Sequence, residues 1–151
     1  MSLSIRKAKF ADLMKTYDWA NDKEVIKNSI NRSTKVSLKE HSEWFNKNID
    51  STTNDLFIVS LKNEKIGLIR IDLIKKAYFI SYLVDKKKRS KGLGYQMLNK
   101  IIKKYNGSKN NFKARVKKNN YASNSIFLNL GFKIKYTNND KNIILYELKN
   151  L

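Results

Sequence analysis

Val84-Asp85-Lys86-Lys87-Lys88-Arg89-Ser90-Lys91-Gly92-Leu93-Gly94 is the stretch of sequence from which the fold of this chain can be worked out. Residues 77–84 before it form a run of aromatic and branched apolar side chains, which is typical of a buried strand. After it, apolar side chains recur at helical spacing as far as Tyr105, namely Leu93, Met97, Leu98, Ile101 and Ile102. We therefore predict a cationic loop that joins the end of a strand to the start of a helix.

This loop has the chemistry of a diphosphate-binding site. Gly92 and Gly94 allow a ligand to approach the backbone closely, and the first turn of the helix offers N–H groups without partners. The helix dipole and the surrounding lysines favour an anion at the same place. The alternative is a solvated basic loop around a glycine turn, because the stretch has neither a P-loop nor the glycine fingerprint of dinucleotide folds.

Length and composition set the class of protein. We expect the 151 residues to form one domain, residues 1–151. The chain contains no cysteine, which excludes disulfides and thiolate metal sites, and we expect no metal. No apolar run approaches the length of a membrane span, and no signal peptide opens the sequence. We expect a cytoplasmic protein of bacterial type with no membrane partner, as a monomer or homodimer.

Positive charge is concentrated in the half of the chain that follows the strand. Residues 1–85 contain 15 Lys and Arg against 11 Asp and Glu, whereas residues 86–151 contain 17 against 2. Such a field attracts coenzyme A, nucleotide-sugar diphosphates or nucleic acid, and it repels polycationic substrates.

The remaining pattern predicts the order of the elements. Ser37 and Glu40 form a capping box that begins a helix of residues 38–49. Short turns link three predicted strands into a meander, and a strand–helix–strand unit follows it. The other predicted strands are residues 3–9, 55–61, 65–74, 112–116, 132–136 and 142–148, and the other helices are 11–19, 23–29 and 122–130. The expected fold class is α/β (α+β), a mixed, mostly antiparallel sheet of about seven strands with helices on both faces.

Two motifs in this order resemble those of the GNAT superfamily of N-acetyltransferases. Arg89-Ser90-Lys91-Gly92-Leu93-Gly94 is similar to its Arg/Gln-x-x-Gly-x-Gly/Ala signature after the fourth strand. Val116, Asn120, Phe127 and Leu130-Gly131-Phe132 are similar to its Val-x-x-x-Asn … Tyr-x-x-x-Gly-Phe segment. The resemblance covers nearly the whole chain and implies transfer of an acetyl group from acetyl-CoA to a primary amine.

The resemblance also implies which residues contact acetyl-CoA, the expected cosubstrate. Backbone groups of Tyr82, Leu83 and Val84 would bind the pantetheine arm and polarise the thioester carbonyl. Asn120 would lie near the coenzyme. Backbone N–H groups would bind the diphosphate from Arg89, Ser90, Lys91, Gly92, Leu93, Gly94 and Tyr95.

The general acid of the family is a tyrosine that protonates the departing thiolate, and this sequence departs from that pattern. Phe127 occupies its position, and Ser123 stands where alanine is usual. Tyr121 is our preferred replacement, while Tyr82, Tyr95, Ser123 and a water molecule stay open. Phe127 itself is expected in the core.

Two side chains are candidates for the base that deprotonates the acceptor amine. Asp72 could point into the cleft from the third strand, or it could be a surface or ion-paired carboxylate. His41 is the only histidine and titrates near neutrality, but it could equally be a packed helix residue.

Short segments near the N-terminus point to the acceptor. Residues 19–22, 28–29, 41–45 and 67–72 resemble acetyltransferases that act on nucleotide-linked amino sugars of the pseudaminic-acid pathway type. Aromatic faces could then stack on a base or sugar, and arginines could meet phosphate. The substrate-binding candidates are Arg32, His41, Trp44 and Arg70. Alternatively, both tryptophans simply fill the core.

Two other functions compete with this one. The acceptor could be a protein N-terminal amine, as in ribosomal-protein acetylation. The chain could instead be a basic nucleic-acid-binding module. We expect no nucleic-acid partner, because charge alone does not require glycines at fixed positions. A polyamine is disfavoured, because it would have to cross a positive field.

Overall fold

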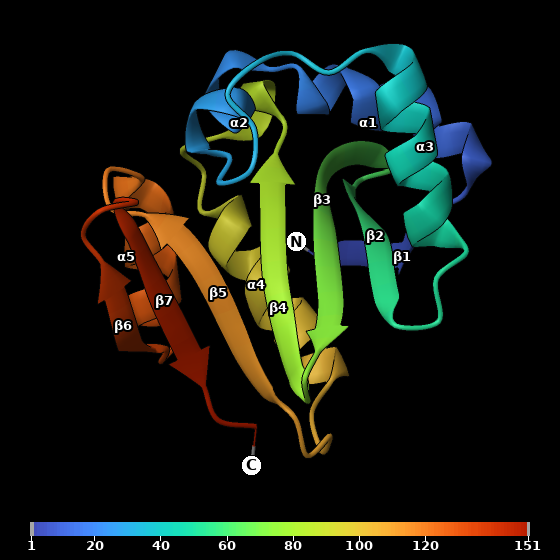
Figure 1. Cartoon of the computed structure of the whole chain (residues 1–151). Helices are drawn as coiled ribbons and strands as arrows, with labels where there is room; N and C mark the ends of the chain where they lie inside the picture. Colours follow the sequence, from blue (N-terminus) through green and yellow to red (C-terminus); the bar gives the residue numbers. More distant parts are fainter. Residues whose placement is uncertain (1, 151) are drawn as a thin grey trace.

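The computed structural model describes residues 2–150, and within them seven strands form one sheet (Figure 1). The strands are β1 (Leu3–Lys7), β2 (Asn54–Leu61), β3 (Glu64–Ile74), β4 (Ala77–Val84), β5 (Asn111–Lys117), β6 (Lys133–Asn138) and β7 (Ile143–Leu148). The α-helices are α1 (Leu13–Ala20), α2 (Lys23–Asn28), α3 (Leu38–Ile49), α4 (Leu93–Lys104) and α5 (Tyr121–Asn129). Short 3-10 helices occupy Phe10–Asp12 and Lys86–Lys88.

The strand order is β1-β2-β3-β4-β5-β7-β6, and only the β4–β5 pair is parallel. The predicted mixed, mostly antiparallel sheet is therefore confirmed. The parallel pair arises because α4 carries the chain across the sheet between β4 and β5, whereas the other neighbours are antiparallel. The first strand ends at Lys7, two residues earlier than predicted, because a 3-10 turn follows.

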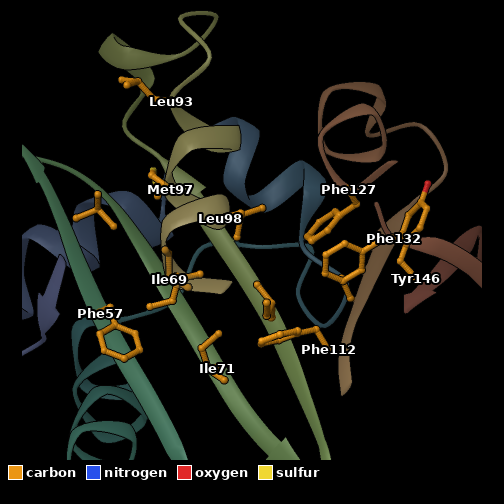
Figure 2. Close-up of a cluster of buried hydrophobic side chains, with 14 of the residues drawn as sticks. Phe57, Ile69, Ile71, Leu93, Met97, Leu98, Phe112, Phe127, Phe132 and Tyr146 are labelled. Carbon is orange, nitrogen blue, oxygen red and sulfur yellow. The ribbon is translucent and has the colours of Figure 1, made fainter. Parts of the chain in front are cut away.

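One face of the sheet is covered by α4 and α5, which lie behind it in Figure 1. Met97, Leu98 and Ile101 of α4 are fully buried against Ile69 of β3. Figure 2 shows Phe127 of α5 facing Phe132 and Tyr146 within the same core. This face holds the larger of the two hydrophobic clusters.

The other face is covered only in part. Phe45 of α3 and Trp19 of α1 pack on Leu56, Ile58 and Leu68 in a second, smaller cluster. The predicted capping box begins α3 here, since the Glu40 N–H donates to the Ser37 side chain at 3.1 Å. In Figure 1 the helices α1–α3 lie at one end, and no helix lies over β5, β7 and β6 on this side. We call the uncovered part of β3, β4, β5 and β7 the open face.

Candidate active site

The parallel strands β4 and β5 separate after a short paired segment. Their register covers only Ala77–Asn111, Tyr78–Phe112 and Phe79–Lys113, and beyond it the strands diverge (Figure 1). The backbone of residues 80–84 therefore has β3 as a partner on one edge and no strand on the other. Such an edge can accept an extended ligand as if it were a strand.

The loop at the open end of β4 presents backbone donors. Ser90 and Gly92 have positive φ values of 62° and 74°, which turn the chain into the start of α4. A Cβ atom at Gly92 would meet nothing within 4 Å, so glycine is required there by conformation and not by space. Within residues 2–150, the backbone N–H groups from Arg89 to Tyr95 make no hydrogen bond. They form the donor row that an anionic group needs.

The loop is held to the N-terminal helices by two side-chain bonds that sequence reasoning missed. Arg89 donates from Nε to the Val84 carbonyl at 3.0 Å and from Nη2 to Asp22 Oδ1 at 2.6 Å. Trp19 donates from Nε1 to Asp85 Oδ2 at 2.8 Å. Burial acts to raise the pKa of Asp85, but the hydrogen bonds from Trp19 and the Lys87 N–H, together with the Lys15 charge, lower it overall. Arg89 thus shapes the loop as well as adding charge.

A cleft of about 1830 Å³ runs from the loop past the divergent strands to the helices α1–α3. The predicted residues that line it are Arg32, His41, Trp44, Arg70, Tyr82, Leu83, Val84, Arg89, Ser90, Gly92, Leu93, Gly94 and Asn120. Lys91, Asp72, Tyr95 and Tyr121 do not line it. Tyr121 is 79% exposed, and Tyr95 is 38% exposed on the first turn of α4.

A hydroxyl pair lies inside the cleft near the divergent strands. Tyr82 donates from its hydroxyl to Ser123 Oγ at 3.1 Å, and Ser123 is buried. Asn120 begins α5 as its N-cap and accepts the Ser123 N–H at 3.3 Å, which fixes the serine in place. Burial raises the pKa of Tyr82, so its hydroxyl stays protonated. Phe127 is 2% exposed and packs on Tyr82, Phe132 and Tyr146, as expected of a core residue.

His41 of α3 contacts α1 and also lines the cleft. Its Nε2 is 2.8 Å from the hydroxyl of Thr16, a buried neighbour that sequence reasoning missed. Its ring packs beside those of Tyr17, Trp44 and Phe45. Burial lowers the pKa of His41, and the charge of Arg32 lowers it further.

Besides Arg89, three arginines line this cleft, each in a different arrangement. Arg32 donates to the Thr34 and Ala20 carbonyls at 2.8 and 2.6 Å, so it holds its loop in place. Arg70 lies 5.8 Å from the Trp44 ring and pairs with Asp72 at 3.1 Å. Burial raises the pKa of Asp72, although the nearby charge of Arg70 opposes this effect.

Arg115 is the third of these arginines, and sequence reasoning did not single it out. Its guanidinium stacks 4.3 Å above the ring of Phe79 on the open face, and both residues line the cleft. Among residues 2–150, no carboxylate forms an ion pair with it. The sequence of β5 contained a signal for its position. Side chains alternate along a strand, so with Phe112, Ala114 and Val116 buried on one face, Arg115 must point to the other.

Within residues 2–150 there is neither a cluster of His, Asp and Glu that could hold a metal ion nor a helix long and apolar enough to cross a bilayer.

Similar folds occur in several solved structures. A domain from Methanocaldococcus jannaschii matches with a TM-score of 0.86 and 22% identity, over 98% of each chain. RimL, a ribosomal L7/L12 α-N-protein acetyltransferase in complex with coenzyme A, matches with 0.85 and 17%, over 99% of this chain and 94% of RimL. Spermidine N-acetyltransferase from Vibrio cholerae, bound to CoA and spermine, matches with 0.82 and 16%, over 98% and 95%.

No curated protein matches the chain in a comparison of sequences. The family model described as the acetyltransferase (GNAT) domain matches residues 2–133, and the divergent β4–β5 pair with its glycine loop lies inside that range. Because this match spans most of the sequence, the chain belongs to the GNAT acetyltransferase family.

Proposed function

We propose that this GNAT enzyme transfers an acetyl group from acetyl-CoA to the amine of a nucleotide-linked amino sugar. The observation that carries the choice of acceptor is the charge of the cleft. Its charged lining consists of Arg32, Arg70, Lys88, Arg89, Arg115, Lys117 and Lys141, against only Glu24 and Glu40. This excess favours an anionic acceptor and disfavours a polycation.

The donor side would hold acetyl-CoA by its backbone. The N–H groups from Arg89 to Tyr95 and the N-terminus of α4 would bind the diphosphate. The pantetheine arm would lie along residues 82–84, where β4 has no neighbouring strand. Support for this placement comes from the continuity of the cleft between the loop and the divergent strands.

Ser123 and Tyr82 are the candidates to protonate the thiolate as it leaves. The Tyr82 hydroxyl donates to Ser123 Oγ, so the serine hydrogen is left to point toward another acceptor. A thiolate beside Ser123 would be that acceptor, and Tyr82 would stabilise the serine oxygen as its proton departs. Tyr121 has no comparable support, because it is exposed outside the cleft.

The nucleotide part would lie on the open face. Arg115 on Phe79 offers a phosphate a guanidinium that is not engaged by a carboxylate. Trp44 and His41 offer flat faces for a base or sugar, and Arg70 lies over Trp44. Asp72 would act here as the partner of Arg70, since it is set back from the cleft.

A panel of amines tests the acceptor. We expect acetylation of UDP- or other nucleotide-linked amino sugars, and competition by the free nucleoside diphosphate. Arg115→Gln should raise the KM for the sugar nucleotide about tenfold, the value of one charged phosphate contact of roughly 1.4 kcal/mol. The KM for acetyl-CoA should stay near the wild-type value. Lys133→Gln, an exposed charge outside the cleft, is the matched control and should change neither constant.

The same panel contains the rival acceptor. A peptide whose N-terminal amine is acetylated readily, while every nucleotide-linked sugar is refused, would reject the sugar assignment. If Arg115→Gln and Lys133→Gln behave alike toward the sugar nucleotide, the open face does not bind its phosphates.

A further inference from the structure

We propose that His41 takes the proton from the acceptor's ammonium group, and that Thr16 is the positioning residue that holds the imidazole in the tautomer this step requires. The inference rests on the proposed function only in assuming an amine acceptor. Its structural basis is a pair of hydrogen bonds that leaves one ring nitrogen of His41 without a partner, on a residue that lines the cleft.

The first bond fixes the direction of the second. Thr16 is 1% exposed, and its hydroxyl donates to the Leu13 carbonyl at 2.9 Å within α1. That hydroxyl has a single hydrogen, so toward His41 it can only accept. The 2.8 Å contact between Thr16 Oγ1 and His41 Nε2 is therefore an Nε2–H donor bond. In the neutral imidazole, the proton resides on Nε2 and the lone pair on Nδ1.

The second nitrogen is available. Among residues 2–150, Nδ1 of His41 has no hydrogen-bond partner. In residues 2–150, the side-chain atoms that are sealed from solvent without a hydrogen bond are Asp72 Oδ1 and Arg70 Nε, which meets Asp72 only as an ion pair; Nδ1 of His41 is not among them. His41 and Thr16 both line the cleft. The lone pair of Nδ1 is thus a proton acceptor that the acceptor site can reach, directly or through one water molecule.

The surroundings keep the ring neutral before it acts. Burial lowers its pKa and Arg32 lowers it further, so at neutral pH the imidazole is uncharged. Tyr17 of α1 and Trp44 of its own helix flank the ring at 5.6 and 5.4 Å. The ionisable groups that face this region are Tyr17, Arg32, Glu40 and Arg70.

The chemistry balances without another reagent. The N–H bond of the ammonium breaks and its proton moves to His41 Nδ1, which gives an imidazolium whose Nε2–H stays on Thr16. The neutral amine attacks the thioester carbon, so a C–N bond forms as the C–S bond breaks. The attached nitrogen passes its second proton to Ser123 or water, which replaces the proton that this group gives to the departing thiolate. The imidazolium then releases its proton to solvent.

The tautomer can be read directly, because His41 is the only histidine of the chain. With ¹⁵N-histidine labelling, long-range ¹H–¹⁵N spectra should show Nε2 as the protonated nitrogen and Nδ1 as the bare one in the wild type at neutral pH. Thr16→Val replaces the hydroxyl by a methyl group and should give a mixture of tautomers. A wild-type spectrum with the proton on Nδ1 would overturn the proposal, whatever the acceptor is.

Kinetics test the role of the ring. The acid limb of the kcat/KM profile should follow the pKa of His41 measured in the same spectra, and His41→Gln should remove that limb and lower kcat about 100-fold. Thr16→Val should lower kcat about tenfold with coenzyme A affinity intact, and Thr16→Ser should recover most of the loss. These kinetics use a UDP-linked amino sugar as the acceptor. If the sugar is not acetylated and a peptide N-terminal amine is, the peptide is used instead. His41→Gln with an unchanged acid limb and kcat would refute the base. If neither amine is acetylated, the proposed acceptor classes fail, while the spectra still decide the tautomer.

Discussion

Removal of the Ser123 and Tyr82 hydroxyls, singly and together, separates the contribution of their hydrogen bond to stability from its contribution to catalysis. Ser123→Ala leaves the partly buried Tyr82 hydroxyl without its acceptor, at 3.1 Å in the wild type. Leaving a buried donor unpaired costs about 1–3 kcal/mol. For a domain of this length each kcal/mol shifts Tm by about 2–4 °C, so Tm should fall by roughly 2–12 °C.

Tyr82→Phe should cost less, about 0.5–1.5 kcal/mol, because the small Ser123 hydroxyl can turn toward the cleft and water. The double variant removes both partners of the hydrogen bond. Its loss of unfolding free energy should therefore be smaller than the sum of the two single losses. Thermal and urea unfolding of the four proteins measure this coupling.

The same substitutions should affect kcat according to which hydroxyl donates the proton. If Ser123 protonates the thiolate, Ser123→Ala lowers kcat about 100-fold while the KM for acetyl-CoA changes little. Tyr82→Phe acts through the serine and should lower kcat about tenfold, and it should add nothing once Ser123 is absent. Retention of kcat within threefold in Ser123→Ala, with the expected loss of Tm, would refute the serine as donor while leaving the hydrogen bond established.

Three further measurements follow from the described contacts. Gly92→Val should lower coenzyme A affinity at least tenfold by calorimetry; its Cβ meets nothing within 4 Å, so the variant should fold, but the positive φ of 74° should make it less stable than the wild type. Gly94→Val is the poorer test, because its Cβ would lie 3.0 Å from Ile126 and 3.2 Å from Tyr82, and equal affinity in a folded Gly92→Val would exclude the loop. Phe127→Leu should lower the free energy of unfolding by about 1–2 kcal/mol through lost aromatic packing without abolishing turnover, and loss of turnover in the folded variant would contradict a purely structural role. Because burial holds the folded pKa of His41 below 6.5, the unfolded chain binds the extra proton first, so unfolding free energy should fall as pH drops through 6.5, and His41→Gln should flatten that slope in urea titrations.

The element order could be predicted from sequence because the hydrophobic periodicity and the turn-forming residues indicate the same elements along the chain. The apolar run of residues 77–84, the glycines of the loop and the helical spacing after Leu93 are local signals, and each matches its element. The register places the start of the separation between β4 and β5 after Phe79.

Contacts between distant residues could not be predicted in the same way. Trp19 and Asp85 are 66 positions apart, and Thr16 and His41 are 25 apart, so these bonds depend on how α1 packs on the rest. For Arg115, alternation gives the face of the sheet but does not tell whether a helix covers that face. Tyr121 was the preferred replacement acid, yet two residues along a helix point about 200° apart, and it is Ser123 that is buried.

Two hydrogen bonds join α1 and α2 to the loop between β4 and α4, and they bear on how binding of one substrate affects binding of the other. Trp19 and Asp22 lie on either side of the α1–α2 turn, and their partners Asp85 and Arg89 bracket the segment that leads into the glycines. The α2 helix forms part of the wall of the same cleft. If the coenzyme and the acceptor bind as proposed, a coenzyme that orders the loop also orders the wall that the acceptor meets. Linkage makes such an effect reciprocal, so the factor by which acetyl-CoA tightens acceptor binding must equal the factor by which the acceptor tightens binding of the coenzyme.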